Sequence, residues 1–375
     1  SEFKMLESLE LNCPKLQKLA LSAPRMNFDL QFANQIVATC PEVNMFHVSN
    51  TPSLNDQSLQ RICAGWSKLT ALIIANCNGL AQPLIQAPLL KGLQFCECVN
   101  LVLPTIQCPM LRKLSFKDTH NLCDGALSVL KADCPDISSL EVTNCSSIRC
   151  PFISIPNIVE LQLNQCTQMT HFVVSMSCTR LNKLTIVGAV NLQHIGVVKP
   201  SCLNISEIVL SQCQSLNDSS FQFFMSLCPL LKSLIVIGCH NLYQPTISIP
   251  GLRLVQFTEC MGLVAPVIRS NALQSLSFRG CINLEVSDLS QVVQPVSTTM
   301  MTLSNPGQCF SSSSGPVQQP PQQPSQQGYA PPLPPSFQQQ YRPPPHHPPL
   351  LPPSYHHQQQ PQQPIQQQWS SSSST

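Results

Sequence analysis

The sequence predicts an α/β solenoid: a horseshoe of stacked coils with one parallel inner sheet and an outer wall that is helical in some coils and extended in others. Three observations support this class. A short apolar phrase recurs at intervals of 21 to 27 residues, the segments between its copies are of two kinds, and the composition changes near residue 300. Nearly all charged residues precede that point, and Gln, Pro and Ser dominate after it. We therefore expect a solenoid over residues 1–298 and a disordered, Gln/Pro/Ser-rich tail over residues 299–375.

The recurring phrase has the form L-x-L-x-x-C, as in the segment from Leu93 to Cys98, with Leu, Ile, Val or Phe in the apolar slots. Alternating apolar residues predict a strand that turns one side toward the interior of the coil. A period of this length with such a phrase is typical of leucine-rich repeats. The twelve copies begin at Leu19, Phe46, Leu72, Leu93, Leu114, Leu140, Leu161, Leu184, Ile208, Leu234, Val255 and Leu276.

Many of the 20 cysteines occupy the last slot of the phrase. Equivalent slots of adjacent coils stack about 5 Å apart, so these side chains are predicted to form a buried column whose S–H groups reach turn carbonyls. We expect free thiols, neither a disulfide framework nor a zinc site, and a reducing compartment, cytoplasmic or nuclear. We also expect the N-x-S motifs at Asn144, Asn204 and Asn217 to be unglycosylated. The column residues are Cys77, Cys98, Cys145, Cys166, Cys213, Cys239, Cys260 and Cys281.

The longer coils predict a helix in the outer wall. After Asp218, a candidate N-cap, the apolar residues Phe221, Phe224 and Met225 keep helical spacing until Pro229 ends the helix. The same layout follows Asp56 and Asp124, and a weaker version ends at Cys40.

The shorter coils predict extended outer segments, because proline removes an N–H donor and fixes φ. Each has a proline eleven residues after its phrase begins and an isoleucine two residues later. These pairs are Pro83 and Ile85, Pro104 and Ile106, Pro151 and Ile153, Pro245 and Ile247, and Pro266 and Ile268.

The element from Leu122 to Cys145, Leu-x-Asp-x-x-Leu-x-x-Leu-x-x-x-Cys-Pro followed by the apolar phrase, resembles the cysteine-containing repeat of F-box/LRR proteins. The thin, proline-containing coils are similar to those of the plant-type members, and the resemblance covers residues 6–290. It implies a module that selects protein substrates for an SCF-type E3 ubiquitin ligase. An F-box, absent from this chain, would bind a Skp-type adaptor and through it the cullin. Because Leu6 and Leu9 already follow the repeat pattern, we expect an upstream part.

The residues before, within and after each pair of apolar slots are predicted to face the concave surface, which solenoids use for binding. Charges of both signs meet there, which fits either a solvated face with mutual ion pairs or a protein-binding patch; apolar residues in the same rows favour the patch. The candidate binding residues are Ile73, Gln94, Lys113, Lys117, Glu141, Glu160, Gln162 and Ile235. The same rows include His47, Ser115, Thr185, Glu207, Gln256 and Arg279.

Several function classes find no support in the sequence. The net charge of +2 gives no indication of a basic surface for nucleic acid. The sequence contains no run of 18 apolar residues, so we expect no membrane-spanning helix. No catalytic or phosphate-binding motif is present, so we expect neither an enzyme nor a cofactor. His120, His171, His194 and His240 are expected to lie in loops.

The tail contains two candidate docking motifs. Pro352, Pro353 and Tyr355 form the P-P-x-Y string that WW domains bind, and residues 331–335 form a polyproline II ligand of the kind that SH3 or WW domains bind. These motifs favour an alternative function, a non-ubiquitin scaffold that bridges a solenoid-bound partner and a WW- or SH3-type protein. The aromatic residues spaced through the Gln-rich sequence also resemble a self-associating segment.

Overall fold

The computed structural model describes residues 11–22, 24–175, 177–198, 204–284 and 300–304. The chain divides into two units, residues 1–310 and 311–375, and all described residues lie in the first. In that described part, none of the helices has the length and apolar character needed to cross a membrane.

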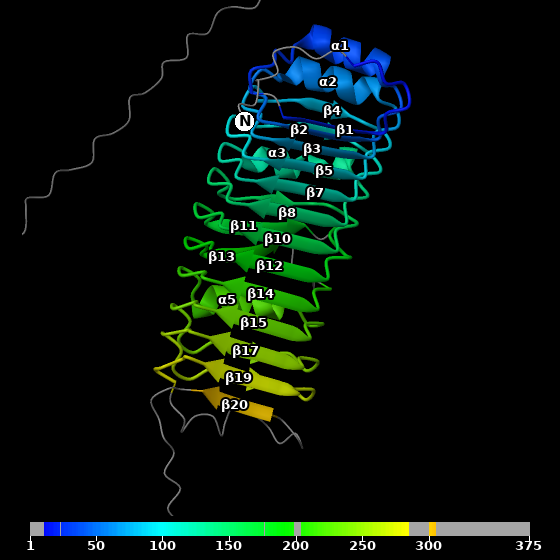
Figure 1. The fold of residues 1–375 in the computed structure, drawn as a ribbon. Helices are drawn as coiled ribbons and strands as arrows, with labels where there is room; N and C mark the ends of the chain where they lie inside the picture. Colours follow the sequence, from blue (N-terminus) through cyan, green and yellow to red (C-terminus); the bar gives the residue numbers. More distant parts are fainter. Residues whose placement is uncertain (1–10, 23, 176, 199–203, 285–299, 305–375) are drawn as a thin grey trace, which may run out of the picture. The chain divides into compact units, whose positions relative to one another are not determined.

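One parallel sheet of thirteen strands runs through the described part of this unit (Figure 1). Its strands follow the chain order, interrupted only by elements of the outer wall. The predicted apolar phrases lie in register, so that Leu72 pairs with Leu93 and Ile74 with Phe95. The parallel inner sheet of the predicted solenoid is therefore confirmed. The strands are β1 Lys18–Ser22, β2 Met45–Ser49, β3 Ala71–Ala75, β5 Gly92–Cys96, β7 Lys113–Lys117, β8 Ser139–Thr143, β10 Glu160–Asn164, β12 Lys183–Val187, β14 Glu207–Ser211, β15 Ser233–Ile237, β17 Leu254–Thr258, β19 Ser275–Arg279 and β20 Met300–Ser304.

The twelve copies counted in the sequence are one short of the sheet. Strand β20 pairs with β19, placing Met301 opposite Leu276 and Leu303 opposite Phe278. Met301 and Leu303 fill the two apolar slots, but Pro306 stands where most other copies have the column cysteine, so the L-x-L-x-x-C pattern was not recognised here. The sheet thus continues into the segment that the sequence assigned to the tail.

The core consists of the second and fourth residues of the strands. In β3, Leu72 and Ile74 are fully buried, whereas Ile73 between them is only half-buried. Equivalent residues stack from coil to coil: the rings of Phe95 and Phe116 lie parallel with centroids 5.6 Å apart. Because each coil buries its apolar side against both neighbours, the core is continuous along the stack.

Helices form the outer wall of the longer coils, as predicted. They are α1 Leu30–Thr39, α2 Asp56–Gly65, α3 Asp124–Ser128, α4 Leu130–Asp133 and α5 Asp218–Ser226.

The predicted N-cap role of Asp218 is wrong. Asn217 caps α5, its side-chain oxygen accepting from the Ser220 N–H at 2.9 Å. Asp218 is the first helical residue, and its carboxylate accepts from the backbone N–H groups of Tyr243 and Gln244 in the next coil, at 3.0 and 2.8 Å. The sequence alone did not distinguish Asn217 from Asp218, because both residue types are favoured at N-caps. In the structure Asn217 has the extended backbone angles of an N-cap, and Asp218 is already helical.

The shorter coils have extended outer segments, again as predicted, with the isoleucines buried. Together with β11 and β13 from the two coils that follow Leu161 and Leu184, these segments pair into three small parallel sheets: β4 with β6, β16 with β18, and β11 between β9 and β13. Their bounds are β4 Leu84–Gln86, β6 Thr105–Gln107, β9 Phe152–Ile153, β11 His171–Ser175, β13 His194–Val198, β16 Thr246–Ser248 and β18 Val267–Arg269.

The predicted cysteine column is confirmed. The eight thiols are buried and free, and their S–H groups reach carbonyls: Cys77 Sγ lies 3.3 Å from the Ala75 oxygen and 3.9 Å from the Val48 oxygen of the preceding coil. Burial raises the pKa of the Cys98 and Cys166 thiols to about 12, so they stay protonated at neutral pH. In two coils threonine fills the slot, and the Thr51 hydroxyl donates to the Ser49 carbonyl at 2.9 Å.

Among the described residues, the one before the column slot has a left-handed backbone in eleven coils, with φ between 50° and 69°. This turn directs the chain away from the sheet toward the outer wall, while the N–H of the turning residue still bonds to the next coil, as from Glu97 to the Lys117 carbonyl at 2.9 Å. Glycine occupies three of these positions. Eight are not glycine: Asn50, Asn76, Glu97, Asp118, Asn144, Gln165, Gln212 and Glu259.

Candidate protein-binding face

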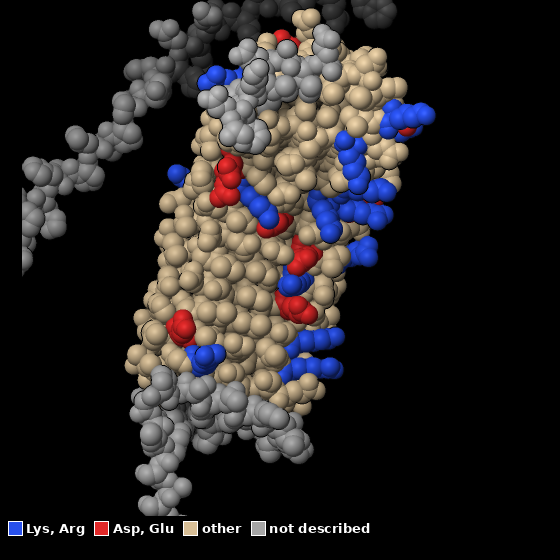
Figure 2. All heavy atoms as spheres, in the orientation of Figure 1, with Lys and Arg blue, Asp and Glu red and all other residues tan. Residues whose placement is uncertain are grey.

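The first, third and fifth residues of the inner strands form what we call the open face of the sheet. Figure 1 shows the inner strands side by side with the helices behind them, and Figure 2 shows the same side as a largely uncharged surface. The structure places all eight candidate binding residues on this face, each at least partly exposed. Lys113 and Glu160 lie in the first row, Ile73, Gln94, Glu141, Gln162 and Ile235 in the middle row, and Lys117 in the last row.

Two ion pairs join neighbouring strands in the middle of the open face. Lys117 Nζ lies 3.0 Å from Glu141 Oε1, and Lys183 Nζ lies 3.1 Å from Glu160 Oε1. The Lys183 ammonium, as hydrogen-bond donor, holds the pKa of Glu160 below its ordinary value. Sequence analysis missed Lys183, although the strand register places it beside Glu160. These four side chains are therefore arranged as the first alternative predicted, in which charges of the face pair with one another.

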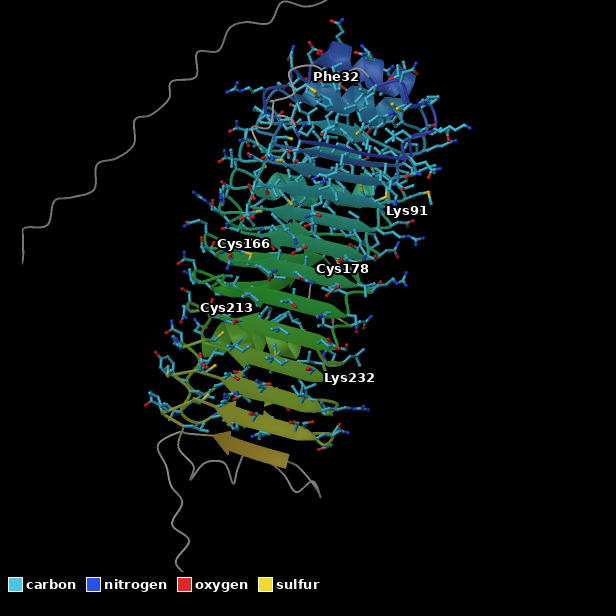
Figure 3. The ribbon with its side chains drawn as sticks, in the orientation of Figure 1. Phe32, Lys91, Cys166, Cys178, Cys213 and Lys232 are labelled. Atoms are coloured by element: carbon cyan, nitrogen blue, oxygen red, sulfur yellow. The ribbon has the colours of Figure 1, made fainter. Side chains whose placement is uncertain are left out.

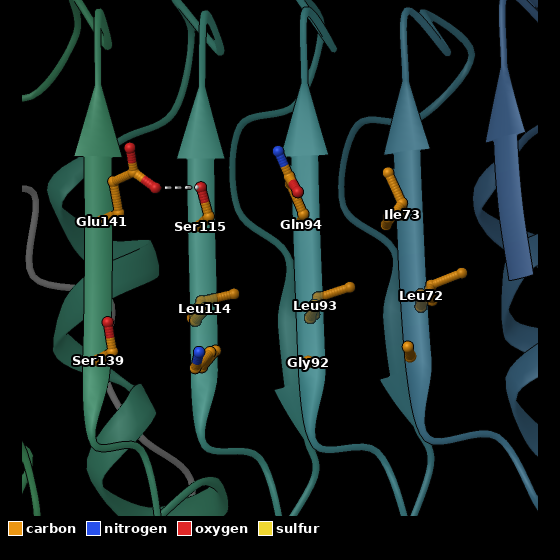
Figure 4. Close-up of a pocket in the computed structure, with 11 residues that line it drawn as sticks. Leu72, Ile73, Gly92, Leu93, Gln94, Leu114, Ser115, Ser139 and Glu141 are labelled. Carbon is orange, nitrogen blue, oxygen red and sulfur yellow. Dashed lines mark hydrogen bonds between the residues drawn. The ribbon is translucent and has the colours of Figure 1, made fainter. Parts of the chain in front are cut away.

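A pocket of about 400 Å³ lies on the open face over β3, β5, β7 and β8 (Figure 4). Ile73 and the edges of Leu72, Leu93 and Leu114 give it apolar walls, and Lys113 and Glu141 lie at its far side. The Ser115 hydroxyl donates to Glu141 Oε2 at 3.2 Å, which fixes the carboxylate at the edge of the pocket.

Gly92 opens this pocket. Its φ is not left-handed, and a Cβ built on it would meet no atom within 4 Å. The backbone therefore does not require glycine at this position, and any larger side chain would project into the pocket.

A second apolar region lies farther along the open face. Val209 and Ile235 are paired in register on β14 and β15, Ile237 follows in the last row, and Leu254 lies in the first row of the next strand, β17, opposite Ser233. All four side chains are half-buried. Only Ile235 was among the candidates named from the sequence; the same three-row rule also covers Val209, Ile237 and Leu254, which were not selected.

Basic residues gather along the edge where the inner strands begin. Figure 2 shows Lys and Arg along this edge, and Figure 3 shows Lys91 and Lys232 extending from it, while Cys166 and Cys213 lie at the opposite ends of the strands. A depression of about 370 Å³ on the same edge is lined by Arg112, Asp136, Ser138, Asn157, Val159 and Arg180.

Two histidines lie elsewhere than the sequence predicted. His171 and His194 begin the outer strands β11 and β13 rather than lying in loops, because the two coils that contain them extend the outer ladder. Their ring centroids are 5.1 Å apart, and His194 Nδ1 lies 2.9 Å from the Ser220 hydroxyl. Over the described residues, no group of three or more His, Cys, Asp or Glu side chains is arranged to hold a metal ion. The tail motif of Pro352, Pro353 and Tyr355 lies outside the described residues.

No protein-family model matches the chain, and no curated protein matches it. Among solved structures, the crystal structure of the Rad7 and Elc1 complex in yeast contains a chain that aligns with 78% of this one and 81% of its own length, at 14% identity and a TM-score of 0.29. At this TM-score the alignment does not establish a shared fold. The repeats and the register of the parallel strands identify the architecture: a leucine-rich-repeat-like solenoid with one open face.

Proposed function

We propose that the chain is a protein-binding module whose open face holds a protein substrate for an SCF-type E3 ubiquitin ligase. The observation that carries the binding role is the open face itself. Apolar side chains such as Ile73, Val209 and Ile235 stand in its outward rows, and in the described part of the chain no helix or strand covers them. Half-exposed aliphatic residues grouped on one surface favour a protein partner.

The ubiquitin role is supported by the resemblance of the segment from Leu122 to Cys145 to the F-box/LRR repeat. In this proposal an F-box outside the chain binds a Skp-type adaptor and through it a cullin, and the solenoid selects the substrate.

The test is affinity purification of the tagged full-length protein from its native cells, followed by quantitative mass spectrometry. We expect adaptor and cullin together with one or more further proteins. The variant Ile235→Asp should lose the further proteins and keep adaptor and cullin, because it places a charge only in the apolar region of the open face. Arg269→Ala, on the outer strand β18, is the matched control and should lose neither. A full-length protein that never co-purifies with adaptor or cullin would refute the ubiquitin role.

The second candidate is a scaffold without a ubiquitin role, motivated by the string Pro352, Pro353 and Tyr355 in the tail. Its test compares capture of WW domains by the native chain and by Tyr355→Ala. We expect the variant to lose capture, since the tyrosine completes the motif. Equal capture by both proteins would remove the motif from the account.

A further inference from the structure

Two depressions lie next to each other where strands β7 and β8 begin. The pocket at Gly92 includes Lys113 and Ser139, and the depression on the strand-start edge includes Arg112 and Ser138, the residues directly before them. The Ser138 hydroxyl donates to the Arg112 carbonyl at 3.2 Å, which ties the two loops together. We call the combined feature the Gly92 groove.

The inner end of the groove fits an apolar side chain. Its walls are the aliphatic groups of Ala71, Leu72, Ile73 and Leu93, and Gly92 leaves the first row without a side chain between Ala71 and Lys113. A glycine that the backbone does not require, over an apolar floor, leaves room for a side chain supplied by a partner.

The outer end of the groove is positively charged. Arg112 and Arg180 line the outer depression, Lys113 lines the pocket next to it, and Lys91 directly precedes Gly92; all four are exposed. Within the described residues the ion pairs are Lys68–Glu42, Lys117–Glu141 and Lys183–Glu160, so these four cations have no carboxylate within 4.0 Å. Arginine forks match carboxylates in two parallel hydrogen bonds.

Two acidic residues also line the groove. Glu141 is paired with Lys117 at 3.0 Å. Asp136 is the single carboxylate among the residues that line the outer depression, where it is outnumbered by Arg112 and Arg180. The local balance therefore favours an anionic ligand.

Resting on the proposed function, we infer that the Gly92 groove binds an acidic linear segment of a partner protein, with one apolar residue in the pocket and flanking Asp or Glu over Arg112 and Arg180. The pocket takes a side chain and the basic edge takes carboxylates, a combination that a peptide offers in a single strand. A nucleic acid would satisfy only the charge.

The test is selection of random nine-residue peptides displayed on phage against the full chain. We expect the enriched peptides to share a Leu, Ile, Met or Phe flanked by Asp or Glu. Affinities of the best peptide are then measured by fluorescence polarisation against variants that either fill the pocket, Gly92→Leu, or reverse the edge charge, Arg112→Glu. Each should weaken binding at least tenfold.

The controls are matched in chemistry. Gly196→Leu, on outer strand β13, also adds a side chain to a glycine whose Cβ would meet open space, and Arg269→Glu reverses a charge on the outer wall. Both should leave affinity within twofold, and all variants should melt like the native chain. The inference is overturned by a selection without acidic enrichment or without binders, by undiminished binding to Gly92→Leu, or by displacement of the peptide by a nine-nucleotide RNA. None of these outcomes affects the purification test of the proposed function, which probes Ile235 at a separate place on the face.

Discussion

The helical coils and the thin coils share one inner side and differ completely on the outer side. The coil with α2 spans 26 residues from Phe46 to Leu72, and the thin coil after it spans 21 residues to Leu93. Both nevertheless present five-residue strands that pair one-to-one with their neighbours. The apolar phrase and the cysteine column thus set the stacking, and the outer wall can change in length without disturbing the register.

The outer walls also close by different means at each junction. Between two thin coils, a carbonyl of the earlier coil accepts from two successive N–H groups: the Ala81 carbonyl bonds the Val102 and Leu103 N–H groups at 2.9 and 3.3 Å. Where a thin coil follows a helical one, the carboxylate of an aspartate accepts from the two successive N–H groups instead. Asp56 bonds the Ala81 and Gln82 N–H groups at 3.0 Å each.

The three aspartate contacts have the same geometry. Asp124 accepts from the Arg149 and Cys150 N–H groups at 3.0 and 2.9 Å, and Asp218 holds the equivalent pair in the third junction. In each case the bonded pair directly precedes a proline of the thin coil. A helix presents its first-turn carboxylate here because its own carbonyls are used within the helix. The aspartate at the start of each of these helices therefore joins the helical outer wall of one coil to the extended outer wall of the next.

The largest effect is expected for a charge in the shared cysteine column. Cys166→Asp should lower the free energy of unfolding by several kcal/mol, on the order of 3 or more, because the carboxylate would be buried without a counter-ion. Cys166 is fully buried, with Sγ 3.6 Å from the Asn164 carbonyl. Urea denaturation followed by circular dichroism measures the change.

The matched control for the column is Cys166→Thr. Threonine already occupies the slot at Thr51 and Thr119 and bonds the same kind of carbonyl in one of them, so this variant should lose no more than about 1 kcal/mol. A melting temperature of Cys166→Asp within a degree of the native chain would contradict the role of the column.

The next effect belongs to the junctions. Asp218→Ala should destabilise by about 1–3 kcal/mol, since it leaves the Tyr243 and Gln244 N–H groups without their acceptor. Asp136→Ala, an exposed aspartate in a turn, should change stability by less than about 0.5 kcal/mol. The measurement is urea denaturation, with hydrogen exchange at Tyr243 and Gln244 as a local readout. Equal stability of both variants would show that the junctions do not depend on the carboxylate.

A smaller and opposite effect is expected at the left-handed turns. Gln212 has φ 55°, a conformation that costs a residue with a Cβ about 1–2 kcal/mol. Glycine avoids this strain, but on folding it loses more conformational entropy than other residues, which costs roughly 0.5–1 kcal/mol. Gln212→Gly should therefore raise the free energy of unfolding by up to about 1 kcal/mol. Gln256→Gly, in the middle of strand β17, should lower it, and a loss of stability in both variants would contradict the strain argument.

Much of the fold could be predicted from the sequence because the apolar phrase repeats a local rule. The strands, the buried thiols and the two kinds of wall all follow from the positions of Leu, Cys and Pro. The last strand was missed since Pro306 replaces the column residue, and Asp218 was misassigned since its bonds reach the next coil, about which spacing within one coil says nothing.

The open face was harder to predict than the fold. The alternation of apolar and polar residues placed Ile73 and Glu141 on the open face correctly. The pocket, however, depends on a missing side chain, that of Gly92, as well as on the residues around it. Gly92 has no repeat signal, and its importance depends on the register that puts it between Ala71 and Lys113. The pairing of Glu160 with Lys183 depends likewise on neighbouring coils, not on neighbouring residues.

The smallest expected effect tests the paired charges of the open face. Because the pKa of Glu160 is lowered in the folded chain, its pairing stabilises the fold above the ordinary carboxyl value of 4.5, and this contribution is lost as the pH falls through the lowered value. Lys183→Gln removes the chief cause, so the Glu160 pKa should rise toward its ordinary value in an NMR titration. Both side chains are partly exposed, so the stability lost near neutral pH should stay below about 1 kcal/mol and shrink under acidic conditions. Lys232→Gln, on the same edge, should leave the Glu160 titration unchanged. An unshifted titration in Lys183→Gln would mean that the pair does not persist in solution and that Glu160 is available, like the cations of the Gly92 groove, to a partner.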